Sequence, residues 1–207
     1  MELRPEYKEE LNKCREDINY FLENYMVVMK WDYFFKFEKR GYQDNIFNAL
    51  CSQNKKIFIT KERQIGMSMC AIFFAFWNSI LNNNQTIFCC RNVDSVKNLQ
   101  EKVEKYAKEM NRYHIFYDIK SDNINYIASY MGFENLRKID ENTTIFIDES
   151  EWVDEENVNF LLKKSEKNKS KICLYSSISD TESEFLKSLK EHSQSYYRDE
   201  KLNIMFF

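Results

Sequence analysis

The sequence predicts an α/β fold in which a mainly parallel central sheet is flanked by helices. The prediction rests on four short, uniformly apolar runs, at residues 56–60, 86–90, 143–147 and 171–175. Helical segments separate these runs, and short apolar strands that alternate with helices form parallel sheets covered on both faces. A further apolar run, at residues 202–207, predicts a last strand. Ligands of such sheets bind at the carboxyl ends of the strands, so the polar residues after each strand are the ones to inspect.

Helices are predicted before and between these strands. We expect them over residues 15–29, 42–53, 68–81 and 182–192. Asp94 and Ser95 lie where an N-cap is expected, ahead of a further amphipathic helix. The apolar face of that helix comprises Leu99, Val103, Tyr106, Ala107 and Met110. Residues 113–131 look extended, and residues 61–67 form a loop that contains Gly66.

Composition is typical of a globular protein with one domain, or with one domain and a small appendage. The chain has 207 residues, of which 43% are hydrophobic and 30% charged. Its net charge of −3 gives no global basic field, so contact with nucleic acid needs a local patch or oligomerisation. Six cysteines without a Cys-x-x-Cys pair argue against a zinc site and fit a reducing cytoplasm. The charged N-terminus does not resemble a signal peptide, and the longest apolar stretch, residues 71–77, is too short to span a bilayer.

Residues 59–69 run in the order strand, loop, glycine, hydroxyl, helix. A phosphate-binding loop needs this order, because its backbone N–H groups wrap the phosphates, the helix N-terminus faces the anion and the hydroxyl holds Mg²⁺. The usual pattern, GxxxxGK[ST], fails here twice. Arg63 or its neighbour replaces the first glycine, and Met67 replaces the lysine. Taken alone, the loop is therefore a weak signal.

A second signal is the apolar run 143–147 followed by Asp148 and Glu149. A buried strand that ends in Asp-Glu presents one carboxylate to Mg²⁺ and a second to the attacking water in phosphate-loop ATPases. The alternative is a solvated turn that happens to carry two acids. The acid pair follows the loop in the chain order that such ATPases use, and the two signals support each other.

Together these segments resemble the ATPase domain of phage large terminases. Arg63–Ser68 resembles the terminase phosphate loop, and Phe146–Glu149 resembles its Asp-Glu strand. Tyr175–Ser177 resembles the hydroxyl-rich coupling motif, and Tyr42–Gln43 resembles the element that reads adenine. Residues 14–25 resemble the start of that domain.

The resemblance covers residues 14–207 and implies a P-loop NTPase of the ASCE/RecA-like class. It implies an N-terminal helical lead-in with an adenine-binding element over residues 1–54, and a P-loop ATPase core over residues 55–207. Large terminases usually carry a nuclease domain as well. We expect none within these residues, and we expect the nuclease on a separate domain or subunit.

The resemblance also implies roles for individual residues. Gly66 allows close approach of the backbone to phosphate. Ser68 and Asp148 hold Mg²⁺, directly or through water. Glu149 orients and deprotonates the attacking water, and Arg63 stabilises charge on the transferring phosphoryl group. The expected nucleotide-binding residues of the loop also include Gln64, Met67 and Met69.

The missing lysine has a candidate replacement. In some terminases the lysine lies at the start of the loop, in a Lys-x-x-x-x-Gly-x-Ser arrangement that Lys61, Gly66 and Ser68 match. An ammonium acts as a point charge and reaches the β- and γ-phosphates from either end of the loop. The alternative is a degenerate site that binds ATP poorly or not at all.

The remaining expected contacts come from hydroxyl, amide and lysine side chains. Ser176 and Ser177 would sense the γ-phosphate and couple its loss to movement. Gln43 can hydrogen-bond adenine edgewise, while Tyr42 packs beside it or in the core. Lys163, Lys164 and Lys167 belong to a basic cluster that contacts the phosphate backbone of DNA or forms a solvated surface loop.

The resemblance implies an ATP-hydrolysing, Mg²⁺-dependent motor that translocates double-stranded DNA into a phage procapsid. Its expected partners are the DNA, a portal protein, a small terminase subunit and further copies of the chain in a ring. We expect it in the cytoplasm of the phage-infected bacterium, with no membrane partner. The alternative is a nucleotide-binding or catalytically inactive scaffold that docks to a portal or another partner. A helicase-type ATPase of another family is a third hypothesis, which the absence of further helicase motifs in so short a chain disfavours.

Overall fold

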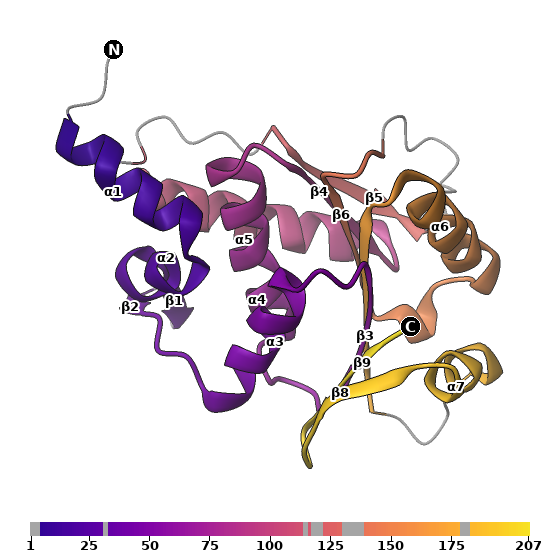
Figure 1. Ribbon diagram of the computed structural model, residues 1–207. Helices are drawn as coiled ribbons and strands as arrows, with labels where there is room; N and C mark the ends of the chain where they lie inside the picture. Colours follow the sequence, from indigo (N-terminus) through magenta and orange to yellow (C-terminus); the bar gives the residue numbers. More distant parts are fainter. Residues whose placement is uncertain (1–4, 31–32, 114–115, 117–121, 130–138, 179–182) are drawn as a thin grey trace.

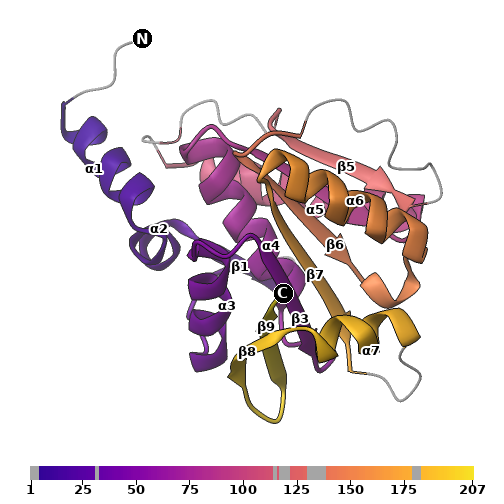
Figure 2. The same ribbon diagram turned by 45° about the vertical axis from the view of Figure 1, so that its right-hand side comes forward.

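The computed structural model describes residues 5–30, 33–113, 116, 122–129, 139–178 and 183–207. A seven-stranded sheet runs through its centre in the order β5-β4-β6-β7-β3-β9-β8 (Figures 1 and 2). Its strands are β3 (Lys56–Lys61), β4 (Gln85–Cys90), β5 (Ile124–Ala128), β6 (Thr143–Asp148), β7 (Lys171–Ser177), β8 (Gln194–Arg198) and β9 (Leu202–Phe206). The five strands from β5 to β3 are parallel, whereas β9 is antiparallel to β3 and β8 is antiparallel to β9. The predicted α/β class with a mainly parallel sheet is confirmed.

The strand before the predicted phosphate loop, β3, is not adjacent to β6, the strand that ends in Asp148. Strand β7 lies between them and is parallel to both. Lys61 pairs with Ser177, and Asp148 pairs with Tyr175. Because the three strands run in the same direction, their carboxyl ends meet at one edge of the sheet. This is the edge at which parallel sheets bind ligands.

Helices cover both faces of the sheet. They are α1 (Pro5–Glu16), α2 (Ile18–Tyr25), α3 (Gly41–Cys51), α4 (Met67–Ala75), the π-helix η1 (Phe76–Leu81), α5 (Val93–Met110), the 3₁₀-helix η5 (Ser150–Trp152), α6 (Glu155–Asn168) and α7 (Glu184–Glu191). Figure 1 shows α1 to α5 on one side of the sheet and α6 and α7 on the other. A small antiparallel hairpin, β1 (Val27–Lys30) and β2 (Tyr33–Lys36), lies beside α2.

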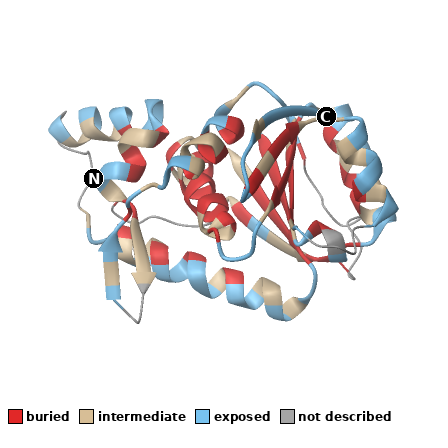
Figure 3. Cartoon of the chain, turned by 90° about the horizontal axis from the view of Figure 1, so that it is seen from below, coloured by how far each residue is buried: buried red, intermediate tan, exposed pale blue. Residues whose placement is uncertain are grey.

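Successive strand residues enter different hydrophobic cores. Ile57 and Ile59 of β3 belong to the larger core, under α1 to α5, whereas Phe58 belongs to the smaller core, under α6 and α7. Phe146 of β6 is fully buried and stacks on Phe88 of β4, with 5.3 Å between the ring centroids. Figure 3 shows buried residues along the strands and on helical faces turned toward them. Burial on both faces explains why the strands read as continuous apolar runs.

The N-terminal segment packs on the larger core as well. Its buried side chains include Phe21, Leu22, Ile46, Phe47 and Leu50, which belong to the same cluster as Ile57 and Tyr175 of the sheet. The chain from α1 to α3 therefore shares one core with the strands. The division into residues 1–54 and 55–207 stays a prediction.

The helix expected over residues 15–29 is wrong in two places. It is interrupted at Asp17, whose side chain accepts a hydrogen bond from the backbone N–H of Asn19 and caps α2. Its last residues form β1, which pairs with β2. Apolar spacing alone did not separate a helix from a short strand that follows it directly.

Two further details differ from expectation. The N-cap of α5 is Asn92, which accepts from the N–H of Ser95, and not Asp94 or Ser95. The lysine-rich stretch belongs to helix α6 and is not a loop. Of residues 113–131, the structure gives a strand at Ile124–Ala128, while parts of this range lie outside the described residues. The helices expected over residues 42–53, 68–81 and 182–192 are confirmed, with small shifts at their ends.

The chain shows no helix, within its described parts, that combines the length and apolar character needed to cross a membrane.

Buried thiols predict a loss of stability in alkali. Burial raises the pKa of Cys14, Cys70 and Cys90 to about 12. Above the pKa of an unfolded thiol, the unfolded chain releases protons that the folded chain keeps, so the free energy of unfolding falls by up to about 1.4 kcal/mol per pH unit for each thiol. Burial lowers the pKa of Lys171 to about 8, which acts in the opposite direction, but the buried thiols outnumber it.

Urea unfolding with a reductant present, from about pH 8 to pH 11, measures this slope. We expect the free energy of unfolding to fall steadily above about pH 9, and we expect Cys70→Ala to lose less stability per pH unit than the unsubstituted chain. A profile that is flat over this range would contradict the assignment of these buried thiols.

Candidate functional site

The loop between β3 and α4 has the backbone geometry of a phosphate-binding turn. Gly66 has φ +87° and precedes the first residue of α4, and Gln64 also has a positive φ, of 63°. A Cβ added at Gly66 would lie 3.2 Å from Nε2 of Gln43 and 3.4 Å from Cε of Met69. Both the positive φ and the close neighbours favour glycine at this position. The expected role of Gly66 in the turn therefore has a geometric basis.

The first turn of α4 faces the carboxyl edge of the sheet. The N–H of Cys70 donates to the carbonyl of Gly66 at 3.0 Å, which starts the helical hydrogen bonding. The N–H groups of Met67, Ser68 and Met69 precede that bond and have no acceptor in the preceding turn of a helix. Such N–H groups, together with the helix dipole, favour an anion.

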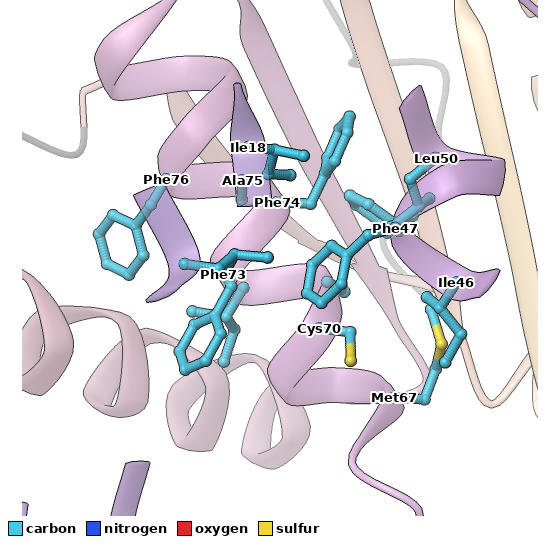
Figure 4. Packing of buried hydrophobic residues seen from close by; sticks show 14 of the residues in the cluster. Ile18, Ile46, Phe47, Leu50, Met67, Cys70, Phe73, Phe74, Ala75 and Phe76 are labelled. Carbon is cyan, nitrogen blue, oxygen red and sulfur yellow. The ribbon is translucent and has the colours of Figure 1, made fainter. Parts of the chain in front are cut away.

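Met67 occupies the lysine position of the usual pattern, but its side chain enters the core. It is only 2% exposed and belongs to the larger hydrophobic cluster. Figure 4 shows it directed toward Ile46 of α3, in a group of side chains that includes Cys70 and Phe47. The backbone of Met67 can still face a phosphate, whereas its side chain lies among apolar residues.

Lys61 is the last residue of β3 and lies at the carboxyl edge of the sheet. Its Nζ donates to Oγ of Ser177 at 3.5 Å, across the β3–β7 pair. The neighbouring Ser176 is 1% exposed, and its Oγ has no hydrogen-bond partner within the described residues. A buried hydroxyl without a partner is rare and marks a place where a ligand or water is expected. Arg63 is exposed on the loop, and no contact among the described residues fixes it to the site.

The acid pair lies at the same carboxyl edge of the sheet, at the end of β6. Asp148 is the last residue of β6 and is half-buried, whereas Glu149 is exposed and has φ 49° and ψ 50°. The left-handed region is costly for a glutamate, and such conformations cluster at functional sites. The N–H of Trp152 donates to the carbonyl of Glu149 at 2.8 Å, which closes the 3₁₀-turn η5 and holds the backbone of Glu149 in place.

A cavity of about 230 Å³ brings the two sequence signals together. It is lined by Ser68, Cys90, Arg91, Ser95, Asn98, Leu99, Lys102, Asp148 and Glu149. The hydroxyl of the phosphate loop thus shares one cavity with both carboxylates of the acid pair. The α5 side of this cavity was not expected: Ser95, Asn98 and Lys102 lie on one side of an amphipathic helix, a spacing that the sequence contains and that sequence reasoning did not use.

The cavity has a negative electrostatic environment on the β6 side. Burial, and then the carboxylates of Asp148 and Glu149, raise the pKa of Cys90 to about 12. Burial and Asp148 likewise raise the pKa of Tyr175 well above its usual value. The Tyr175 hydroxyl is fully buried beside Ser68, and among the described residues no hydrogen bond of normal geometry reaches it. A polyanion at this edge therefore needs positive charge nearby.

The donor set fits Mg²⁺. Ser68 and Asp148 offer a hydroxyl and a carboxylate oxygen in one cavity, and Mg²⁺ prefers oxygen ligands. The described residues contain no group of three or more His, Cys, Asp or Glu side chains that would hold a metal without help. This is the usual case for Mg²⁺ in phosphate sites, where one or two protein ligands are completed by substrate phosphates and water.

The two residues of the expected adenine element support the loop in this structure. Tyr42 Oη donates to the carbonyl of Ile65 at 3.1 Å. Gln43 is 3% exposed, and its Oε1 accepts from the N–H of Arg40 at 2.9 Å. Its Nε2 lies against Gly66. The side chains thus tie α3 to the phosphate loop, and their contact with adenine stays a prediction.

The basic cluster lies away from the cavity. Because β6 and β7 are parallel, α6 returns from the carboxyl edge of the sheet to the amino edge, and its second half carries Lys163, Lys164 and Lys167. Glu166 pairs with Lys56, the first residue of β3, at 3.3 Å. The lysines therefore lie near the amino edge, opposite the candidate site.

Comparisons with known proteins show which solved structures share this fold. No protein-family model and no curated protein matches the chain. Among solved structures, the large terminase ATPase domain of Thermus phage P74-26 is similar, with a TM-score of 0.53 at 14% identity, over 84% of this chain and 73% of that chain. An arginine-to-alanine variant of the same domain gives a TM-score of 0.57 at 12% identity, over 84% of this chain and 74% of that chain. At this identity the similarity establishes the fold, and the chain has the fold of a phage terminase ATPase domain.

Proposed function

We propose that the protein is a Mg²⁺-dependent ATPase of the DNA-packaging type. The observation that carries the proposal is the convergence of Ser68, Asp148 and Glu149 on one cavity, from parts of the chain far apart in sequence. The glycine turn before α4 and the terminase-like fold support it.

Each group at the site has a chemical role in this proposal. The N–H groups at the start of α4 and the Ser68 hydroxyl hold the phosphates, and Asp148 shares the metal with Ser68. Mg²⁺, when bound, neutralises charge on the phosphate oxygens. Glu149 accepts a proton from the attacking water and orients it. Lys61 reaches the phosphates from the end of β3 by leaving its contact with Ser177.

The contact between Lys61 and Ser177 could also couple phosphate release to a conformational change. Transfer of the ammonium from Ser177 to a phosphate, and back after phosphate release, would change the hydrogen bonding at the end of β7. In a ring of subunits with double-stranded DNA, a portal protein and a small terminase subunit, such a change would drive translocation. Arg63, exposed on the loop, is free to reach a phosphate of the same site.

A second candidate function is a nucleotide-binding or inactive scaffold that docks to a portal or another partner. The burial of Met67 favours it, because the usual phosphate-binding cation is absent at the start of α4. The two candidate functions differ in whether the protein hydrolyses ATP.

ATP hydrolysis by the purified chain tests the proposed function. We expect turnover that requires Mg²⁺ and is abolished by chelation with EDTA, measured as released phosphate. Calorimetric titration with ATP and Mg²⁺, in parallel, measures binding. Binding without turnover, in the presence and absence of double-stranded DNA, would favour a nucleotide-binding scaffold; no binding at millimolar ATP would exclude the ATPase and favour an inactive scaffold.

A further inference from the structure

The phosphate loop of this protein lacks a cation at the point where the usual pattern has one. Met67 is buried in the core. Lys61 contacts Ser177 and does not line the cavity that holds Ser68 and the acid pair. A triphosphate carries several negative charges, and Asp148 and Glu149 add two more. Lys61 and Arg63 can approach the phosphates only from outside this lining, so we expect cations that already line the cavity to contribute as well.

Two basic residues line the cavity from the α5 side. They are Arg91, directly after β4, and Lys102, in the middle of α5. We propose that Arg91 and Lys102 are phosphate-binding residues that contact the terminal phosphates of ATP and replace the cation absent at position 67. The proposal rests on the proposed function, because it concerns the same cavity and the same substrate.

Arg91 is held at the cavity in a way that leaves its donors available. Its guanidinium lies over the ring of Trp152, with 4.6 Å to the ring centroid. A cation–π contact uses none of the guanidinium N–H groups as hydrogen-bond donors, so they remain able to donate to a ligand. The carbonyl of Arg91 accepts from Oγ of Ser129 at 2.9 Å, which fixes the backbone from which the side chain extends. Planar N–H groups in a fixed fork match the geometry of phosphate oxygens.

Lys102 faces the cavity by helix geometry. Ser95, Asn98 and Lys102 are spaced by three and four residues, so they lie on one side of α5. Leu99, between them, packs into the larger core and fixes the rotation of the helix. Within the described part of the chain, the Lys102 ammonium makes no hydrogen bond or ion pair. A lysine that is free of partners and lies at the edge of a cavity can reach a phosphate as a point charge.

The charges of the cavity agree with this assignment. Two carboxylates on the β6 side, Asp148 and Glu149, face two cations on the α5 side. Phosphates placed between Ser68 and α5 would contact the two cations, and Mg²⁺ held by Ser68 and Asp148 would offset carboxylate charge. Without Arg91 and Lys102, the lining of the cavity would carry negative charge only, and a polyanion would be repelled.

Binding of ATP and of ADP by Arg91→Ala and Lys102→Ala, measured by calorimetry with Mg²⁺, tests the proposal. We expect each substitution to weaken ATP binding by about tenfold to a hundredfold, because each removes a charge-assisted contact. ADP binding should weaken less, because it lacks the terminal phosphate. Lys97→Ala is the matched control: Lys97 is exposed on the same helix but lies roughly 140° around it from Lys102. It should bind ATP within about twofold of the unsubstituted chain.

The outcomes separate this proposal from the proposed function. If the unsubstituted chain binds ATP and both alanine variants bind it equally well, the assignment of Arg91 and Lys102 is wrong while the nucleotide site stands. If the unsubstituted chain does not bind ATP, both fail. A structural role for Arg91 would instead lower the melting temperature and weaken ATP and ADP binding equally, and this result also overturns the proposal. Arg91→Lys, which keeps the charge, should recover part of the ATP affinity.

Discussion

Replacing Glu149 with alanine or glutamine is expected to reduce ATP turnover by about a hundredfold or more while ATP binding is retained. A carboxylate that accepts a proton from the attacking water contributes on the order of 10²–10⁴ in rate. Glu149 is exposed to the cavity and held by the η5 turn, so its loss removes the base without disturbing a core. Glutamine keeps the shape and the hydrogen-bonding reach but cannot accept the proton. Released phosphate and calorimetric ATP binding are the two measurements.

Glu141→Gln is the control for this prediction. Glu141 is exposed and precedes β6, at the opposite edge of the sheet from the cavity, so its substitution should leave turnover unchanged. The left-handed backbone at Glu149 gives a second readout, because glycine is free of the steric cost there. Glu149→Gly should therefore fold at least as stably as Glu149→Ala while hydrolysing ATP no faster. Full turnover in any of these Glu149 variants would show that another group activates the water.

Introducing the usual lysine, by Met67→Lys, is expected to destabilise the protein by about 3–5 kcal/mol rather than to strengthen ATP binding. Residue 67 is 2% exposed, and its side chain points toward Ile46 in the cluster that also contains Cys70 (Figure 4). The described residues that share a core cluster with residue 67 are apolar, so an ammonium there would be an unpaired buried charge, which is costly. Urea unfolding and calorimetric ATP titration measure the two quantities.

Met67→Leu separates the effect of charge from the effect of shape. A swap of similar volume in a core costs less than about 1.5 kcal/mol, so this variant should unfold near the unsubstituted chain. If Met67→Lys were as stable as Met67→Leu and bound ATP more tightly, the side chain of residue 67 would face the phosphates. The need for Arg91 and Lys102 in the site would then disappear.

The local sequence pattern was sufficient to predict those elements of the fold that depend on residues close together in the chain. The strands β3, β4, β6 and β7 were predicted because each is a short apolar run, and apolarity on both faces already indicates a buried strand. The break at Asp17 was missed because a cap and a short hairpin interrupt a spacing that remains helical. Strand β8 was missed because most of its residues are exposed and carry no apolar signal.

Some residues of the candidate site could likewise be chosen from local sequence, whereas others were revealed only by the structure. The order of glycine, hydroxyl and acid pair is local to two segments, so Ser68, Asp148 and Glu149 could be chosen from the sequence. Arg91 was visible only as a polar residue after a strand, and Lys102 only as one of several lysines on a helix. Their common cavity requires α5 to lie against the carboxyl edge. The sequence did not reveal that Oε1 of Gln43 caps α3, and the contact of Gln43 with adenine stays a prediction.

The sequence by itself determined the strand runs, the glycine turn and the acid pair, because each depends on residues close together in the chain. Tertiary structure decided which way Met67 points, where the lysines of α6 lie and which cations reach the cavity. These depend on the rotation of α4 and α5 against the sheet, and that rotation is set by how distant apolar side chains pack together. A single residue position cannot reveal whether its side chain faces a core or a ligand until the partners on both sides are in place.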